Sequence, residues 1–201
     1  MDSVASLIER AVIALSACRH SDAESALLAV DYPALVQARR EAMNRVWGPA
    51  GAAAGYKSPF PLAKRLAPRS SDVRATFVRE GYVCRYSHCR RRTISLDVLK
   101  LLSKAFPDVL PYHPNWKPVE NHILYWAYST SLEHRVPFPS GGTSSAENLL
   151  TACYMCNDVK KHLPVELLGW TIDPLPDGSE WDGLTRHLPS LRQVVVAHSG
   201  C

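Results

Sequence analysis

Apolar residues recur every three or four positions in several stretches of the chain, and this spacing predicts amphipathic helices. The first stretch carries Val4, Leu7, Ile8, Ala11, Val12 and Leu15. A second runs from Pro33, whose missing amide is harmless in a first helical turn, to Trp47 before Gly48 and Pro49. We expect these two helices to pack together.

Later stretches predict further helices at residues 70–81, 96–106, 119–128 and 154–163. Between the last two of these, residues 131–136 and 147–152 are short and rich in β-forming residues. Prolines and the Gly141-Gly142 pair separate them, which favours a hairpin with a wide loop. The pattern therefore predicts an α+β fold in which a helix directly follows a β-hairpin.

Glycine, alanine and proline dominate residues 51–68, as is typical of a linker. We place a boundary near residue 65, which gives a helical N-terminal segment at 1–65 and a main module at 66–168. Residues 93–130 of that module have the character of a helical insertion. The tail, 169–201, carries Trp170, Trp181 and Leu184, and we expect these side chains to pack back on the module.

The formal charge of +4 and the sequence pI near 8.8 agree with an acidic partner, although so small an excess decides nothing alone. The distribution is more informative, because residues 74–92 contain six arginines and a single acid, Glu80. The arginines are Arg74, Arg79, Arg85, Arg90, Arg91 and Arg92. Such a run is either a solvated surface or a surface for phosphate.

Asp2, Glu9 and Arg10 interrupt the start of the chain where a secretory signal would need a basic end and then unbroken apolar sequence. No apolar run approaches the ~18 residues of a membrane-spanning helix. We therefore expect a cytoplasmic protein with no membrane partner. In a reducing compartment its cysteines are read as metal ligands or free thiols and not as a disulfide framework.

Four of the six cysteines form two pairs, Cys84-x4-Cys89 and Cys153-x2-Cys156, and two such pairs complete a tetrahedral zinc site. His88 is an alternative to Cys89 as ligand. Four protein ligands leave no position for a substrate, so this zinc would be structural. The alternative without a metal is that these are four unrelated buried cysteines. Cys18 and Cys201 are interpreted as free thiols.

The order of motifs between and after these cysteines is Glu133-His134, Gly141-Gly142, Asn148 and then Cys153-x2-Cys156-Asn157. This order resembles the HNH, or ββα-metal, endonucleases, and in particular the branch in which an asparagine follows the last zinc cysteine. The resemblance covers residues 73–167. It implies a zinc-stapled ββα-metal module that cuts DNA.

The resemblance implies that His134 is the general base, since an imidazole accepts a proton from water near neutral pH. Glu133, on the opposite face of the strand, and Asn157 would hold a divalent cation, most simply Mg²⁺ or Mn²⁺. The family more often has aspartate where Glu133 stands, which alters the reach to the metal. Asn148 would bond the backbone across the loop and keep His134 aimed. His162 is a minor alternative ligand.

Basic side chains would flank this site and contact the DNA backbone. They are Arg85, Arg90, Arg91, Arg92, Arg135, Lys160 and Lys161. Two rival interpretations stand beside the endonuclease: a non-catalytic zinc-bound module that binds nucleic acid or protein, and a toxin-type RNase. Each site residue also has a plainer role, since His134 can be a core residue, Asn157 a helix cap and Asn148 a turn residue. Oligomeric state and sequence specificity are not readable from these residues.

Overall fold

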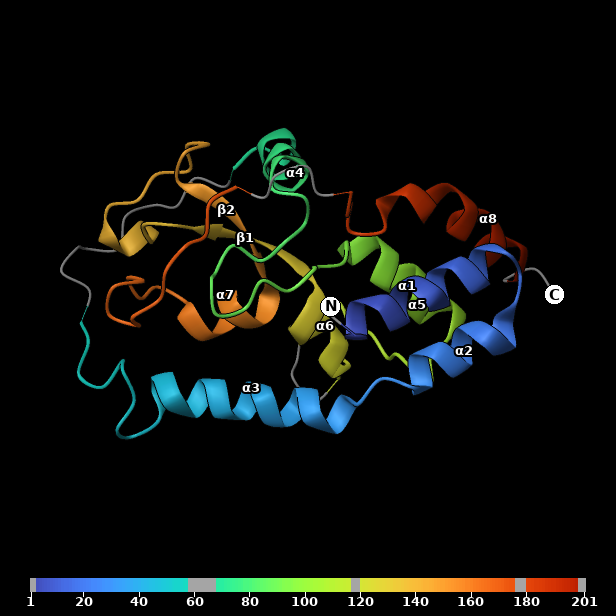
Figure 1. Cartoon of the computed structure of the whole chain (residues 1–201), viewed down its shortest axis with the longest axis horizontal. Coiled ribbons are helices and arrows are strands. Elements are labelled where there is room, and N and C mark those ends of the chain that lie inside the picture. Colours follow the sequence, from blue (N-terminus) through green and yellow to red (C-terminus); the bar gives the residue numbers. More distant parts are fainter. Residues whose placement is uncertain (1–2, 58–67, 117–119, 176–179, 199–201) are drawn as a thin grey trace.

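The computed structural model describes residues 3–57, 68–116, 120–175 and 180–198 (Figure 1). The chain has an α+β fold: helices surround a two-stranded antiparallel sheet. The boundary expected near residue 65, and Cys201, lie outside the described residues.

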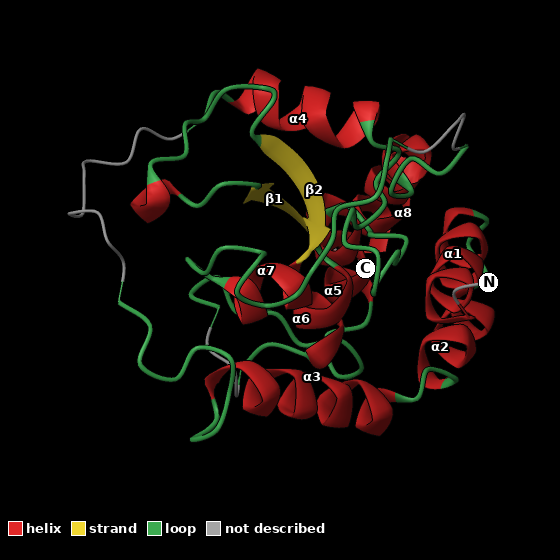
Figure 2. Ribbon diagram, turned by 60° about the vertical axis from the view of Figure 1, so that its left-hand side comes forward, coloured by secondary structure: helices red, strands yellow, loops and turns green. Residues whose placement is uncertain are grey.

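A hairpin followed by a helix forms the centre of the fold, as the sequence pattern predicts. Strand β1 (Thr130–His134) pairs with β2 (Leu149–Cys153), with Thr130 opposite Cys153 and His134 opposite Leu149. Helix α7 (Tyr154–Lys160) begins at the residue after β2. It packs on one face of the sheet, and α4 (Ser70–Arg79) packs on the other (Figure 2). All residues of β2 are buried in consequence.

The insertion leaves and rejoins the sheet at one place. Ile94 forms a parallel bridge with Ser129, its amide donates to the Tyr128 carbonyl (2.9 Å), and its carbonyl accepts from the Thr130 amide (2.9 Å). Between these points lie α5 (Leu96–Ala105) and α6 (Ile123–Tyr128). Helix α6 begins four residues later than the sequence pattern indicates, after a proline-containing loop.

A second group of helices packs beside the hairpin unit. Helix α1 (Ser3–Ser16) packs against α2 (His20–Leu28) and α8 (Leu188–His198), and α8 packs on α5. The sequence pattern does not reveal α2, because its nine residues bury only Ala23, Ala26 and Leu27. Helix α8 was likewise not anticipated within the tail, although Trp181 and Leu184 are buried as expected.

The sequence pattern led us to expect that α1 packs on the helix that begins near Pro33. In the structure each of these two helices makes its main contacts elsewhere. The second of them, α3 (Tyr32–Trp47), packs instead on α6 and α7. The Trp47 indole donates to the Val159 carbonyl (2.7 Å), and Arg39 pairs with Asp158 (2.6 Å). The N-terminal helices are thus divided between the two halves of the fold.

No helix in the described ranges combines the length and the apolar content that a membrane crossing requires.

We predict that α8 contributes to the stability of the whole chain. Leu191 is fully buried, so Leu191→Ala should lower the free energy of unfolding by about 2–5 kcal/mol, measured by urea denaturation. Val196 in the same helix is 73% exposed, and Val196→Ala should change it by less than about 0.5 kcal/mol. Equal effects of the two substitutions would contradict this packing.

Candidate functional site

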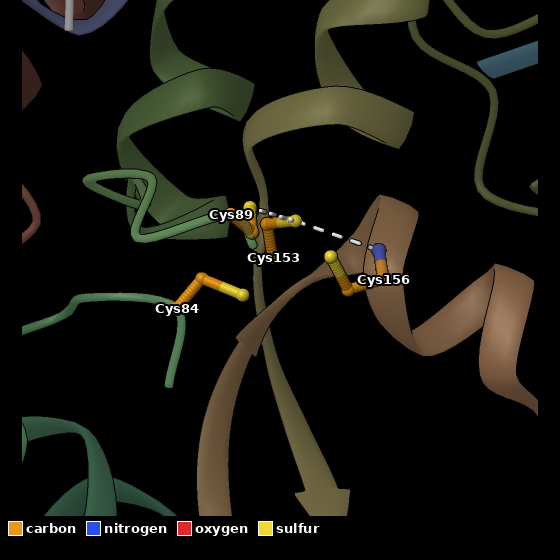
Figure 3. A group of neighbouring side chains, drawn as sticks. All are labelled: Cys84, Cys89, Cys153 and Cys156. Atoms are coloured by element: carbon orange, nitrogen blue, oxygen red, sulfur yellow. Dashed lines mark hydrogen bonds between the residues drawn. The ribbon is translucent and has the colours of Figure 1, made fainter. Parts of the chain in front are cut away.

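Four cysteines converge where the hairpin meets α7 (Figure 3). Cys84 and Cys89 belong to a tight loop closed by a hydrogen bond from the Cys84 amide to the Arg91 carbonyl (2.8 Å). Cys153 ends β2, and its sulfur accepts from the amide of Cys156 in the first turn of α7 (3.4 Å). A loop and a strand–helix junction that are far apart in the sequence thus meet through sulfur atoms.

The geometry of the cluster fits a tetrahedral metal ion. All four Sγ atoms lie within 4.8 Å of one another, and those of Cys89 and Cys153 are 3.7 Å apart. A zinc ion with bonds of about 2.3 Å places its four sulfur ligands about 3.8 Å apart. The His88 Nε2 lies 3.7 Å from the Cys156 sulfur, beside the cluster, so the structure favours Cys89 over His88 as the fourth ligand. These cysteines could hold a metal ion such as zinc.

Burial makes this cluster dependent on positive charge. Burial raises the pKa of the Cys84 thiol well above its usual value, and the neighbouring Cys153 adds to the effect. The Arg91 guanidinium lies 3.8 Å from the Cys153 sulfur. Burial lowers the pKa of Arg91, but the adjacent Cys153 and Cys89 more than offset this, so its pKa is raised. One guanidinium cannot balance four thiolates, whereas a divalent ion bonded to all four would neutralise half of their charge and Arg91 would offset part of the rest.

Asn148 fastens the wide loop of the hairpin as expected. Its side-chain oxygen accepts from the Val136 amide (2.8 Å), and its Nδ2 donates to the carbonyls of Val136 (3.0 Å) and Thr143 (2.7 Å). Gly142 is required here, because a Cβ atom at this position would lie 1.8 Å from the Val136 oxygen. The loop is thereby held directly after His134.

His134 ends β1 and is 6% exposed. Its Nε2 lies 3.2 Å from the hydroxyl of Ser144, a residue of the wide loop that the sequence did not single out. The imidazole is therefore buried, and it contacts the loop that Asn148 fastens.

Glu133 is buried and paired with a residue expected to contact DNA. Its Oε1 lies 3.0 Å from the Nζ of Lys160, which is fully buried, and it accepts from the His134 amide (2.7 Å). Lys160 also donates to the His134 carbonyl (3.2 Å). Lys160 thus ties α7 to the end of β1 and does not belong to the surface.

Asn157 faces the middle of β1 from α7. Its Nδ2 donates to the Ser131 hydroxyl (2.6 Å) and the Leu132 carbonyl (2.8 Å), which leaves Oδ1 as the atom suited to a cation. Glu133, however, is already neutralised by Lys160. Glu133 therefore already has a cationic partner within the protein.

His162 lies away from these residues. Its ring packs against those of Trp47 and Tyr56, with centroids 5.7 and 6.0 Å apart. The structure therefore gives no support to His162 as an alternative ligand.

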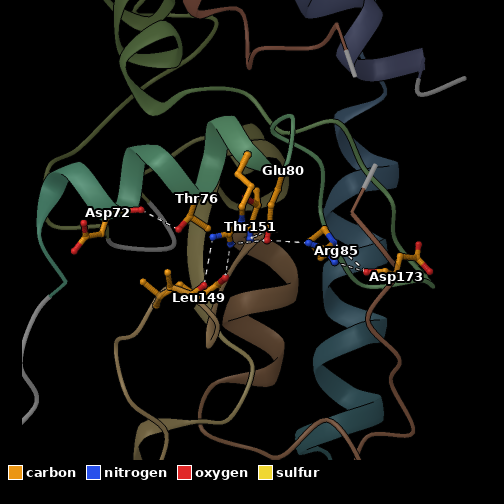
Figure 4. Close-up of polar contacts among 9 residues, drawn as sticks. Asp72, Thr76, Glu80, Arg85, Leu149, Thr151 and Asp173 are labelled. Atoms are coloured by element: carbon orange, nitrogen blue, oxygen red, sulfur yellow. Dashed lines mark hydrogen bonds and ion pairs between the residues drawn. The ribbon is translucent and has the colours of Figure 1, made fainter. Parts of the chain in front are cut away.

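Part of the arginine-rich segment belongs to a buried network at Glu80 and Arg85 (Figure 4). Arg85 is buried and pairs with buried Glu80 (2.8 Å), whose other oxygen accepts from the Thr151 amide of β2 (2.6 Å). Arg79 joins the network by pairing with Glu80 (2.9 Å) and donating to the Leu149 carbonyl (2.9 Å). This network fastens α4 to the sheet, and it removes Arg85 from the surface expected to bind DNA.

The other predicted contacts differ in exposure. Arg92 stacks over Trp181 and bonds the Ser6 hydroxyl (2.7 Å), so it joins the tail and α1 to the module. Arg90 is exposed and pairs with Asp173 (2.6 Å). Arg135 and Lys161 are also exposed, the latter over the Trp47 ring. Arg90, Arg135 and Lys161 are the members of the predicted set that solvent reaches most readily.

Comparison with protein-family models, curated proteins and solved structures finds no match to this chain.

We predict one zinc per chain, held by the four cysteines. Cys153→Ser or Cys156→Ser should abolish zinc in elemental analysis and yield unfolded or insoluble protein, because such sites couple metal binding to folding. Cys18→Ser is the control, since Cys18 is exposed and outside the cluster. Soluble, folded wild-type protein without zinc would contradict the prediction.

We also predict that Lys160 and Glu133 stabilise the fold only as a pair. Lys160→Met should lower the free energy of unfolding by about 3–5 kcal/mol, since it strands a buried carboxylate. The double substitution Lys160→Met with Glu133→Gln should recover most of that loss. Mn²⁺ should raise the melting temperature of Lys160→Met more than that of wild type if Glu133 can ligate a cation. If Lys160→Met leaves the free energy of unfolding unchanged, the ion pair is not formed.

Proposed function

We propose that this chain is a metal-dependent endonuclease that hydrolyses phosphodiester bonds in DNA. The observation that carries the proposal is the hairpin–helix unit itself. It gathers His134, Glu133, Asn148 and Asn157 around one strand and one helix, beside a cysteine cluster suited to structural zinc. The hairpin, the helix that follows it and the cysteine cluster are what the resemblance to HNH nucleases implies, whereas the pairing of Glu133 with Lys160 is not part of that implication.

In the proposed reaction His134 acts as general base. It takes a proton from a water molecule as that water forms a bond to phosphorus, and the bond to the leaving 3′-oxygen breaks. The position supports this role, because the imidazole lies at the end of β1 next to a fastened loop. The loop supplies rigidity, which a general base needs to stay within hydrogen-bond reach of its water.

A divalent cation would supply positive charge to the phosphate and to the leaving oxygen. On Glu133 such an ion would share with the Lys160 ammonium a carboxylate whose charge Lys160 already neutralises. Asn157 Oδ1 would be its second protein ligand. The structural zinc is a separate ion in this proposal, since four thiolates leave it no open position.

The Glu133–Lys160 pair also supports a second candidate function. A carboxylate that is permanently paired suits a zinc-bound scaffold that binds nucleic acid or protein without cleaving it. Cleavage of DNA by the purified protein separates the two candidates. A parallel digest of RNA separates the endonuclease from a toxin-type RNase.

We predict that His134→Ala lowers the rate at which supercoiled plasmid is cut by ~10²–10⁴-fold, the usual contribution of a positioned base. The assay is run with Mg²⁺, with Mn²⁺ and with chelator, and cleavage should need added cation. Zinc content should match wild type. His113→Ala is the control, because His113 is a partly exposed residue of the insertion that pairs with Glu120. If His134→Ala cuts plasmid as fast as wild type, His134 is not the base.

A further inference from the structure

A groove of about 860 Å³ opens between α4 and α8, which lie along the same side of the molecule (Figure 1). Its floor includes Thr130, Ser131 and Leu132 of β1. Its walls come from α4, the insertion, the start of α7 and the tail. Most of its lining residues therefore lie outside residues 84–89 and 133–157, which carry the motifs.

The groove joins positive charge to aromatic surface. Arg74 of α4 and Arg192 of α8 are exposed and contribute opposite walls. Arg186 is a third cation, and it pairs with Asp182 (3.1 Å), so this pair is locally neutral. Asp97 is the remaining acidic residue of the lining, which leaves the groove with a small excess of positive charge.

Phe77, Tyr82, Trp116 and Tyr154 are the aromatic residues of the lining, and the last two form a stacked pair. Their rings are stacked, with centroids 4.5 Å apart and planes 17° from parallel, and both residues line the groove. Cations that follow a phosphate backbone together with aromatic rings on which bases stack are the features of single-strand binding sites. A duplex hides the faces of its bases and cannot stack in this way.

The floor of the groove is formed by the same strand, β1, that carries His134 of the proposed reactive centre. Asn157 bonds Ser131 and Leu132, both of which line the groove floor. His134 lies two residues beyond Leu132, about 7 Å along the strand at the usual rise per residue. Asn157 and His134 do not themselves line the groove, so a strand bound in it would approach the proposed reactive centre along β1.

We propose that this groove binds single-stranded nucleic acid, with phosphates on Arg74 and Arg192 and a base stacked beside Trp116 and Tyr154. The direction of the strand, toward His134, rests on the proposed endonuclease function. Binding itself does not, because the groove is defined by its own residues.

The test is fluorescence anisotropy with a labelled oligonucleotide of about 15 nucleotides, within the length that such sites bind. It is run without added divalent cation, so that cleavage does not compete, over a range of salt concentrations. Single-stranded DNA, single-stranded RNA and duplex DNA of the same length are compared. The two single-stranded probes show which sugar the groove accepts.

The double variant Arg74→Ala with Arg192→Ala should lose at least about tenfold in affinity, and its salt slope should fall by about 1.4, the value for two phosphate contacts on a single strand. The control is Arg10→Ala with Arg40→Ala, which removes the same charge from exposed positions outside the groove. Trp116→Ala should weaken binding by about 5- to 150-fold, whereas Trp116→Phe should keep most of it.

Equal losses in the groove variant and its control would overturn the proposal, as would tighter binding of duplex than of single strand. A protein that binds single strands in the groove but leaves plasmid intact would uphold the groove and refute the endonuclease. If the protein binds no single strand, and Arg74→Ala with Arg192→Ala still cuts plasmid, the groove proposal is refuted and the endonuclease is upheld.

Discussion

The structure depends on bringing four sulfur atoms to one point from two segments of chain. Cys89 and Cys153 are separated by 64 positions, and their sulfurs are 3.7 Å apart. The loop that carries the first cysteine pair must therefore lie against the junction of β2 and α7. A two-stranded hairpin is at best marginally stable by itself, so this link and the helices on both faces are what maintain it.

Two ionic networks act alongside the sulfur cluster. On one face of the sheet, Glu80 joins α4 and Arg85 to the backbone of β2. On the other, Lys160 joins α7 to Glu133 and the end of β1. Each network places a buried carboxylate between a helix and the sheet, where an unpaired charge would be strongly unfavourable. The positions of His134 and Asn157 follow from these attachments.

The sequence predicted the parts of the fold in which pattern and local chemistry coincide. The hairpin, α7, α4, α5 and the paired cysteines all have strong local signals, and so does the role of Asn148 in bonding the loop. Local pattern could not show that Lys160 pairs with Glu133, or that Arg85 pairs with Glu80, because each pair depends on tertiary packing. Asn157 and Lys160 are three residues apart and share a helix face, which was the available hint that Lys160 points toward the strand. Helix α2 was missed because alanines give a weak amphipathic signal.

The parallel bridge between Ile94 and Ser129 makes the intervening segment a closed excursion from the sheet. Its two ends are adjacent, so its length can change without moving β1 or the cysteine loop. The entropic cost of such a change is small, since doubling the length of a loop costs only about 0.6 kcal/mol. This segment also contributes Trp116 and the first residues of α5, Leu96 and Asp97, to the lining of the groove. Because α5 packs on α8 and α6 packs on α3 and α7, such a change is best tolerated between the two helices, in the stretch that carries Trp116 of the groove. Evolution can therefore reshape the surface beside the hairpin by editing that stretch of the chain.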